Sequence, residues 1–190
     1  HWLAVANGFM ALLLAGAGLA PWLMLQGHTR AGEILYTLYR PLCHQLPERS
    51  FFIGGERPWY SLGDLAARLG YEPPLRYVGN PHLGYKIAFC QRDVAVYGGF
   101  LVAGLAFALI RRHAHKPLPW QLLVASIVPM AIDGMLQLLG LLESIWVRRT
   151  ATGLLFGCGV VAFVYPLLQQ GMDEAREIAR RIEEGKDASA

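Results

Sequence analysis

Two short segments of the sequence carry residue types that bind metal ions or act as nucleophiles. Cys43 and His44 are adjacent, and Cys90 precedes Asp93 by three positions. Together they offer two thiolates, one imidazole and one carboxylate, a set that Zn²⁺ accepts in a tetrahedron. The spacing of Cys90 and Asp93 is that of a two-residue ligand knuckle, whereas adjacent ligands such as Cys43 and His44 are less usual. These residue types suit a zinc site made of Cys43, His44, Cys90 and Asp93, which is one of three interpretations.

The cysteines have two further interpretations. In an oxidising compartment Cys43 and Cys90 would form a disulfide that ties a long loop to the segment after it. Alternatively, both remain free thiols. Cys158, in contrast, stands among Gly and Val in an apolar segment and is typical of an inert small side chain. The sequence leaves disulfide, metal site and free thiols open.

A second group of polar residues stands inside or beside long apolar segments, where a charge costs at least about 2.5 kcal/mol. Asp133 is the clearest case, and Gln137 follows one helical turn later on the same face. We expect the Asp133 carboxylate to pair with an arginine. The candidate partners are Arg92, Arg148 and Arg149. The full set of candidate ligand-binding residues is Arg49, Arg92, Asp133, Gln137, Glu143 and Arg149. This set forms either an ion-pair network that fixes helix register or a functional polar pocket.

The elements that hold these residues are long and apolar. Of the 190 residues, 54% are hydrophobic and only 16% are charged, whereas soluble domains carry about a quarter charged residues. Four segments approach the length of about 20 residues that crosses a bilayer. They are residues 2–25, 93–110, 119–142 and 150–168. Helices of a soluble bundle would show a polar face, and these show almost none. The sequence predicts an all-α integral membrane four-helix bundle.

Polar segments lie between and after the predicted spans. Residues 26–89 form a long loop, with an interfacial helix expected at 31–42 and a short amphipathic helix at 61–69. Tyr36 and Tyr39 suit the headgroup layer. Apolar residues recur at helical spacing over 172–182, which predicts an amphipathic tail helix. We therefore divide the chain into a transmembrane domain, residues 1–168, and a charged cytoplasmic tail, residues 169–190.

The basic residues predict an orientation. The short loop Arg111–Lys116 and the tail are rich in Arg and Lys, which is typical of cytoplasmic segments. Arg148 and Arg149 lie at the opposite end of the bundle and oppose this assignment, unless a site holds them. We predict a plasma-membrane protein with both termini in the cytoplasm and the 26–89 loop outside. All the polar candidates then gather near the outer end.

Other classes of function are poorly supported. The net charge of +3, from 17 basic and 14 acidic residues, is too small to indicate nucleic acid as a partner. The sequence contains no Walker phosphate loop, no GxGxxG after a strand and no HExxH. The small-residue pairs Gly153 with Gly157 and Gly99 with Ala103 indicate close helix packing rather than chemistry.

Several motifs resemble a known family. They are CHQLPERSFF at 43–52, CQRD at 90–93, DGMLQ at 133–137 and TGLLFG at 152–157. Over about residues 40–165 the chain is similar to small prokaryotic membrane proteins of the family called domain of unknown function 2085. The resemblance implies a membrane protein and no particular activity. In that family a second cysteine often stands where this sequence has Asp93, and residues 56–87 are an insertion between motifs that are usually close.

Two classes of function follow. In one, the chain is an accessory or assembly subunit of a larger membrane complex, with the bilayer and other membrane subunits as partners. In the other, the polar cluster binds a metal ion or a small anionic ligand, or performs metal-assisted chemistry. The small size and the lack of a recognisable catalytic set favour the subunit.

Overall fold

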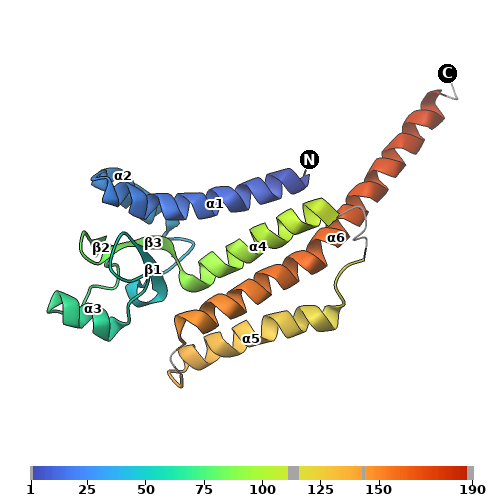
Figure 1. Ribbon diagram of the computed structural model, residues 1–190. Helices are drawn as coiled ribbons and strands as arrows, with labels where there is room; N and C mark the ends of the chain where they lie inside the picture. Colours follow the sequence, from blue (N-terminus) through green and yellow to red (C-terminus); the bar gives the residue numbers. More distant parts are fainter. Residues whose placement is uncertain (1, 111–115, 143, 188–190) are drawn as a thin grey trace.

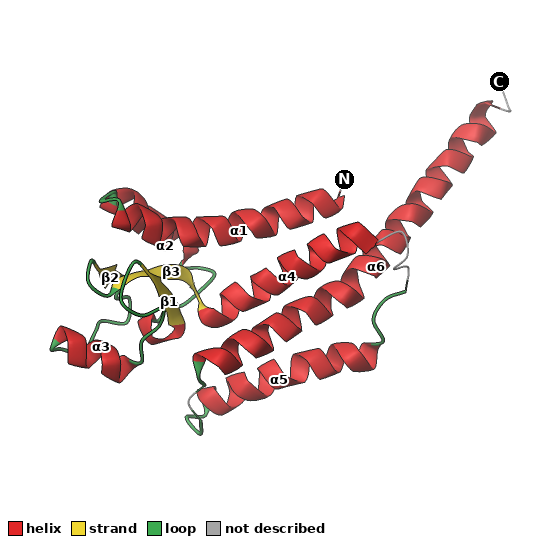
Figure 2. Ribbon diagram, viewed as in Figure 1, coloured by secondary structure: helices red, strands yellow, loops and turns green. Residues whose placement is uncertain are grey.

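Four long helices carry a small mixed cap at one end of the molecule (Figures 1 and 2). The computed structural model describes residues 2–110, 116–142 and 144–187. The long helices are α1 (Trp2–Leu25), α4 (Gln91–Ile110), α5 (Trp120–Leu138) and α6 (Trp146–Asp187). All four are long and apolar enough to cross a membrane, so the prediction of four long apolar helices is confirmed.

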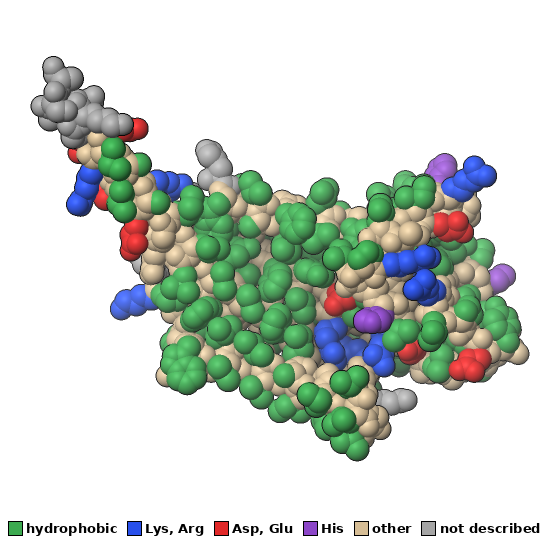
Figure 3. Space-filling view, turned by 180° about the vertical axis from the view of Figure 1, so that it is seen from behind, with side chains coloured by type: hydrophobic (Ala, Val, Ile, Leu, Met, Phe, Trp, Pro, Cys, Tyr) green, Lys and Arg blue, Asp and Glu red, His purple; other side chains and the backbone are tan. Residues whose placement is uncertain are grey.

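The four helices form an open row. Neighbours along the row are α1 with α4, α4 with α6, and α6 with α5, so α1 and α5 occupy its two edges (Figure 1). Much of each helix surface remains exposed, as in the window of α5, where only 11% of residues are buried within the protein. A broad hydrophobic belt covers this part of the molecule (Figure 3). In a bilayer, lipid chains would cover these exposed apolar side chains.

Glycines allow α4 and α6 to pack closely. A methyl group at Gly99 would lie 2.9 Å from the Leu154 carbonyl oxygen, and one at Gly153 would lie 2.9 Å from the Arg92 carbonyl oxygen. Such distances leave no room for a side chain, so the two backbones are in direct contact. The expectation that these small residues serve helix packing is confirmed.

Helix α6 is much longer than a membrane is thick. Its 42 residues span about 63 Å, against a hydrocarbon core of about 30 Å. The predicted tail helix is therefore the continuation of α6, and it projects past the other helices (Figure 1). The helix continues without a break through Pro166 and residues 168–172.

The cap, residues 26–90, joins α1 to α4. Its helices are α2 (Thr29–Tyr39), the 3₁₀ helix η1 (Pro47–Arg49) and α3 (Leu62–Leu69). Its strands are β1 (Ser50–Ile53), β2 (Gly79–Asn80) and β3 (Gly84–Cys90). They form an antiparallel sheet in the order β1-β3-β2, with Ser50 opposite Cys90. The all-α prediction is wrong here, because short strands of aromatic and apolar residues pair across the loop.

Helix α2 packs on the long helices. It contacts α1, and Tyr36 and Tyr39 are buried with Ala17, Ala20 and Phe89. The Tyr39 hydroxyl donates to the Leu13 carbonyl oxygen of α1 at 2.7 Å. The expectation that these tyrosines face lipid headgroups is wrong, because both lie in the core between α1, α2 and β3.

Helix α3 forms where the sequence predicts it. Ser61 and Asp64 make reciprocal capping hydrogen bonds at its start, and Gly70 ends it in the left-handed conformation at φ +76°. Leu65 is fully buried and anchors the helix to Phe52, Tyr60 and Leu83.

Candidate functional site

The cap meets the long helices at the end where α1 and α5 finish and α4 and α6 begin. We call this the cap end and the opposite one the far end. Lys and Arg side chains gather on the surface at the cap end, beside the hydrophobic belt (Figure 3). Strand β3 runs directly into α4 there, with Cys90 as its last residue and Gln91 as the first residue of the helix. This continuity positions the Cys90–Asp93 segment at the junction.

Three of the four predicted metal ligands come together. The ligand atoms of Cys43, Cys90 and Asp93 all lie within 4.8 Å of one another. The Cys90 Sγ is 3.1 Å from the Asp93 Oδ2. Cys43 is buried, and the other two side chains are half-buried. The structure thus brings Cys43 beside Cys90 and Asp93, while their binding of a metal stays a prediction.

His44, the fourth predicted ligand, does not join this group. Cys43 points into the core, whereas the His44 side chain is exposed. The two neighbours therefore face different surroundings, and the cluster found among the described residues contains only two thiols and one carboxylate. His44 still lines the cavity in front of the cluster.

Backbone N–H groups surround the two sulfur atoms. Cys43 Sγ accepts hydrogen bonds from the Gln45 amide at 3.4 Å and from the Cys90 amide at 3.2 Å. Cys90 Sγ accepts one from the Asp93 amide at 3.5 Å, within the first turn of α4. Such donors, together with the positive end of a helix, favour the thiolate form that binds metals.

The three acidic groups also influence one another. A hydrogen bond from Cys90 lowers the pKa of the Cys43 thiol. The same contact, then burial and the Asp93 carboxylate, raise the pKa of Cys90. The pKa values of the two thiols are thus shifted in opposite directions. A divalent cation would replace the thiol protons on binding and remove the repulsion between the groups.

A hydrogen-bonded frame holds the loop that carries Cys43. Gln45 adopts a left-handed backbone conformation at φ 56°, and its side-chain Nε2 donates to the Tyr36 carbonyl oxygen at 2.8 Å. The Lys86 ammonium donates to the Gln45 carbonyl oxygen, and the Tyr36 hydroxyl donates to the Lys86 carbonyl oxygen. Lys86 is fully buried, and burial lowers its pKa to about 8. The frame was not predicted from the sequence, although a lysine inside the apolar run GYKIAFC is a signal for it.

The predicted pairing of Asp133 with arginine is confirmed. Its carboxylate lies 2.5 Å from Arg92 Nη2 and 3.1 Å from Arg148 Nε, and the Ser144 hydroxyl donates to it at 2.7 Å. Only 5% of the Asp133 side chain is exposed. Since Arg92 is on α4 and Arg148 on α6, a single carboxylate of α5 joins three helices.

The other described residues of the predicted set lie around this network. Arg149 is buried, and its Nη1 donates to Gln91 Oε1 at 3.1 Å and to the Glu48 carbonyl oxygen at 3.4 Å. Arg49 pairs with the Glu48 carboxylate at 3.7 Å. Gln137 lines the same cavity as both arginines. Glu143, also predicted for the site, lies outside the described residues.

One cavity of about 400 Å³ brings the two groups of side chains together. Its polar lining combines the thiol and carboxylate cluster with arginines and amides. These side chains are Cys43, His44, Gln45, Arg49, Cys90, Arg92, Asp93, Gln137 and Arg149. Leucines complete the wall, among them Leu138 at the end of α5. The cavity is thus a polar pocket beside the lipid-facing surface.

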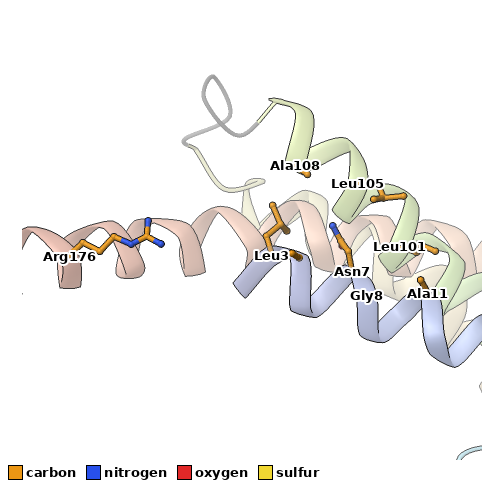
Figure 4. A pocket seen from close by; sticks show the side chains of 9 residues that line it. Leu3, Asn7, Gly8, Ala11, Leu101, Leu105, Ala108 and Arg176 are labelled. Carbon is orange, nitrogen blue, oxygen red and sulfur yellow. The ribbon is translucent and has the colours of Figure 1, made fainter. Parts of the chain in front are cut away.

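A larger cavity of about 840 Å³ lies at a distance from this chemistry. It is a groove between α1 and α4, lined mainly by Leu and Ala, and Asn7 points into it (Figure 4). Arg176 of α6 stands at its edge. Its described lining holds no cluster of nucleophilic or metal-binding side chains, so it suits apolar chains rather than a reaction.

Comparison with known proteins places the chain in a family. The family described as "Predicted membrane protein (DUF2085)" matches residues 82–163. An uncharacterized protein of Methanocaldococcus jannaschii, MJ1492, is 30% identical over 174 residues, covering 88% of this chain and 92% of the relative. The chain belongs to the DUF2085 family. The resemblance seen in the motifs is thereby confirmed. No solved structure matches this family member.

The match to DUF2085 covers one side of the candidate site. It includes Cys90, Asp93, Asp133 and Arg149, and it leaves out the segment of Cys43. The family assignment describes a membrane protein, in agreement with the four apolar helices. The family description names no reaction, so the chemistry of the site follows from its geometry alone.

Proposed function

We propose that this membrane protein binds a zinc ion at the cap end through Cys43, Cys90 and Asp93. The observation that carries the proposal is the approach of their three ligand atoms to within 4.8 Å of one another. Thiolates and carboxylates are both zinc ligands, at about 2.3 Å and about 2.0–2.2 Å from the ion. Small side-chain rotations would bring three such atoms onto a common ion.

The ligand count supports a reactive rather than a purely structural metal. Structural zinc sites have four protein ligands, whereas catalytic sites have three and leave a position for water or substrate. Here the cluster has three ligands and faces a cavity of about 400 Å³. A zinc-bound water in that cavity would serve metal-assisted chemistry.

We further propose that the cap lies outside the plasma membrane and that both termini are cytoplasmic. At the far end, α4 stops before the basic segment 111–116, and the α6 extension is also rich in arginine, which suits the cytoplasmic side. Arg148 and Arg149 oppose this orientation by their position. Their contacts with Asp133 and Gln91 give them partners in the site, and in our proposal these contacts account for two arginines on the outer side.

Metal analysis of the purified protein tests the zinc site. In detergent and under reducing conditions, we expect about one zinc per chain, the stoichiometry of a single mononuclear site. Cys90→Ser and Asp93→Asn should lose most of the metal. Cys158→Ser changes a cysteine that packs between α6 and α4, its Sγ 3.7 Å from the Gly99 carbonyl oxygen, and should keep it.

Either of two results would overturn the zinc site. One is a wild-type protein, purified under the same reducing conditions, that contains no zinc. The other is equal zinc in the wild type and in Cys90→Ser. Circular dichroism of each variant shows whether it has kept its helices.

A subunit role is a second candidate, because the cap exposes apolar side chains. Leu75 is 76% exposed and Tyr71 is 57% exposed, on a part of the chain outside the four spans. Such side chains suit contact with another protein. Purification in mild detergent should then recover a partner that is lost with Leu75→Asn, and a wild-type protein that always purifies as a lone chain would count against this role.

A further inference from the structure

The cavity in front of the thiol cluster has a wall rich in positive charge. Arg49, Arg92 and Arg149 all line it. Arg92 pairs with the Asp133 carboxylate, and Arg49 has the Glu48 carboxylate at 3.7 Å. The zinc ligands contribute negative charge on the other wall, but a bound zinc ion would largely neutralise them. The wall of arginines would then set the sign of the field in the cavity.

Arg149 is the most informative of these residues. Its side chain is buried, with the whole residue only 7% exposed. Its Nη1 donates to two neutral acceptors, the amide oxygen of Gln91 and the backbone carbonyl of Glu48. Its Nε is buried and has no hydrogen-bond partner among the described residues. Burying a guanidinium whose hydrogen-bond acceptors are neutral costs free energy. An anion in the cavity would supply the opposite charge and a further acceptor.

We infer that this pocket binds a phosphate group, held by Arg149 and Arg92 with Arg49 at the rim. The planar fork of a guanidinium donates two parallel hydrogen bonds to phosphate oxygens. A phosphate dianion matches a wall of three arginines better than a carboxylate with its single charge. One phosphate oxygen would also take the fourth position of the proposed zinc ion, and for this contact the inference rests on the proposed function.

At a membrane surface, a phosphate group can come from two sources. A free phosphate or phosphate monoester reaches the pocket from water, and a phospholipid headgroup reaches it from the bilayer. The second route is open because Leu42 and Leu138 line the same cavity and are 50% and 81% exposed. Both sources present the same group to the same arginines.

Equilibrium dialysis with radiolabelled inorganic phosphate tests the inference. The protein is purified in a phosphate-free detergent, and its zinc content is measured in the same samples. We expect saturable binding to the wild type and binding about tenfold weaker or more in Arg149→Gln, since hydrogen bonds between charged groups are the strong ones. Arg57→Gln removes an exposed cap arginine outside this cavity and should bind as the wild type does.

Competition against the bound labelled phosphate distinguishes the two sources and tests the choice of phosphate over another anion. Displacement of the label by short-chain phosphatidic acid supports a lipid headgroup, and displacement only by a soluble phosphate monoester supports a soluble ligand. Acetate that competes as well as phosphate would overturn the choice of phosphate.

Equal phosphate binding by the wild type and Arg149→Gln, at equal zinc content, would overturn the inference and leave the zinc site standing. Absence of zinc from the wild type would instead remove the zinc site, whether or not phosphate binds.

Discussion

Asp133 shows how a single acidic residue is accommodated in a lipid-facing helix. The helix α5 is mostly exposed, yet the Asp133 side chain is only 5% exposed and lies between two guanidinium groups and a hydroxyl. A carboxylate in hydrocarbon without these partners would be costly. The cost falls because opposite charges and a hydrogen-bond donor replace water around it.

Removing that charge should destabilise the protein. Asp133→Asn leaves Arg92 and Arg148 facing a neutral amide, and we expect a loss of about 2–3 kcal/mol. The loss should be at the lower end of the range for buried pairs, because the Arg148 side chain is 41% exposed. Unfolding by added denaturing detergent, followed by circular dichroism, measures the change.

The matched control is Asp173→Asn on the α6 extension. Asp173 pairs with Arg176 at 3.2 Å, and both side chains are more than half exposed. This change should alter stability by less than about 0.5 kcal/mol. Equal effects at positions 133 and 173 would show that burial of the Asp133 pair is not what matters.

Lys86 predicts a pH dependence of stability. Burial lowers its pKa to about 8 from an ordinary value of 10.5, so the unfolded chain binds more protons than the folded one between these values. Stability contributed by this group therefore increases as the pH rises from about 8 to about 10.5. Below that window the folded protein bears the full cost of a buried charge.

Thermal unfolding of the wild type and Lys86→Met over this pH range checks the prediction. The Tm of the wild type should rise relative to that of the variant as the pH increases. The comparison cancels the titration of other groups that both proteins share. A difference in Tm that stays constant from about pH 7 to about pH 10 would contradict the lowered pKa.

The contacts of some of these residues could be predicted from the sequence, and those of others could not. The Asp133 ion pairs follow from the cost of an isolated charge in hydrocarbon, which demands a partner whatever the details of the fold. The exclusion of His44 from the cluster depends on which way the loop turns. At that turn Gln45 adopts a left-handed conformation and accepts a hydrogen bond from the buried Lys86. The lysine is conspicuous in an apolar run of the sequence, but its contact with Gln45 is seen only in the tertiary structure.

At the scale of elements, the contact between α4 and α6 is the most extensive in the row of helices. Gly99 faces the α6 backbone, whereas a methyl group at Gly98 would have open space around it, with no atom within 4 Å. Gly99→Leu should therefore separate the two helices and cost about 1–3 kcal/mol. Gly98→Leu, one residue away, should be tolerated. Denaturing-detergent titration of both variants makes the test, and similar losses at the two positions would contradict the packing described.

The four spans were predictable because each requires only a long apolar run. Helix α5 ends at Leu138 and α6 begins at Trp146, both earlier in the chain than predicted, because Gly140 at φ +69° breaks the first helix and Arg148 and Arg149 belong to the second. The sheet could not be predicted from local pattern. Strand β1 has only four residues, and β3 continues without a break into α4. The sequence pattern of such short strands is weaker than that of a long apolar helix, so neither strand could be recognised from the sequence.

At the scale of the whole molecule, the proposed orientation separates two charged ends. Glu72 is exposed on the cap, and Glu183 is exposed on the α6 extension. In intact cells a membrane-impermeant maleimide should label Glu72→Cys, and it should label Glu183→Cys only after permeabilisation. The wild type, with its own cysteines, measures the background. Labelling of both positions from the same side would overturn the arrangement of the spans.

The shared carboxylate of Asp133 has a consequence for how the chain is made. Arg92 precedes Asp133 in the sequence, and Arg148 follows it, so one candidate ionic partner for α5 is present in the chain before α6 has been synthesised. A nascent chain truncated after α5 should therefore still insert that helix into the bilayer, provided that Arg92 is present. We therefore expect the order of these three residues in the sequence to protect α5 before α6 has been made.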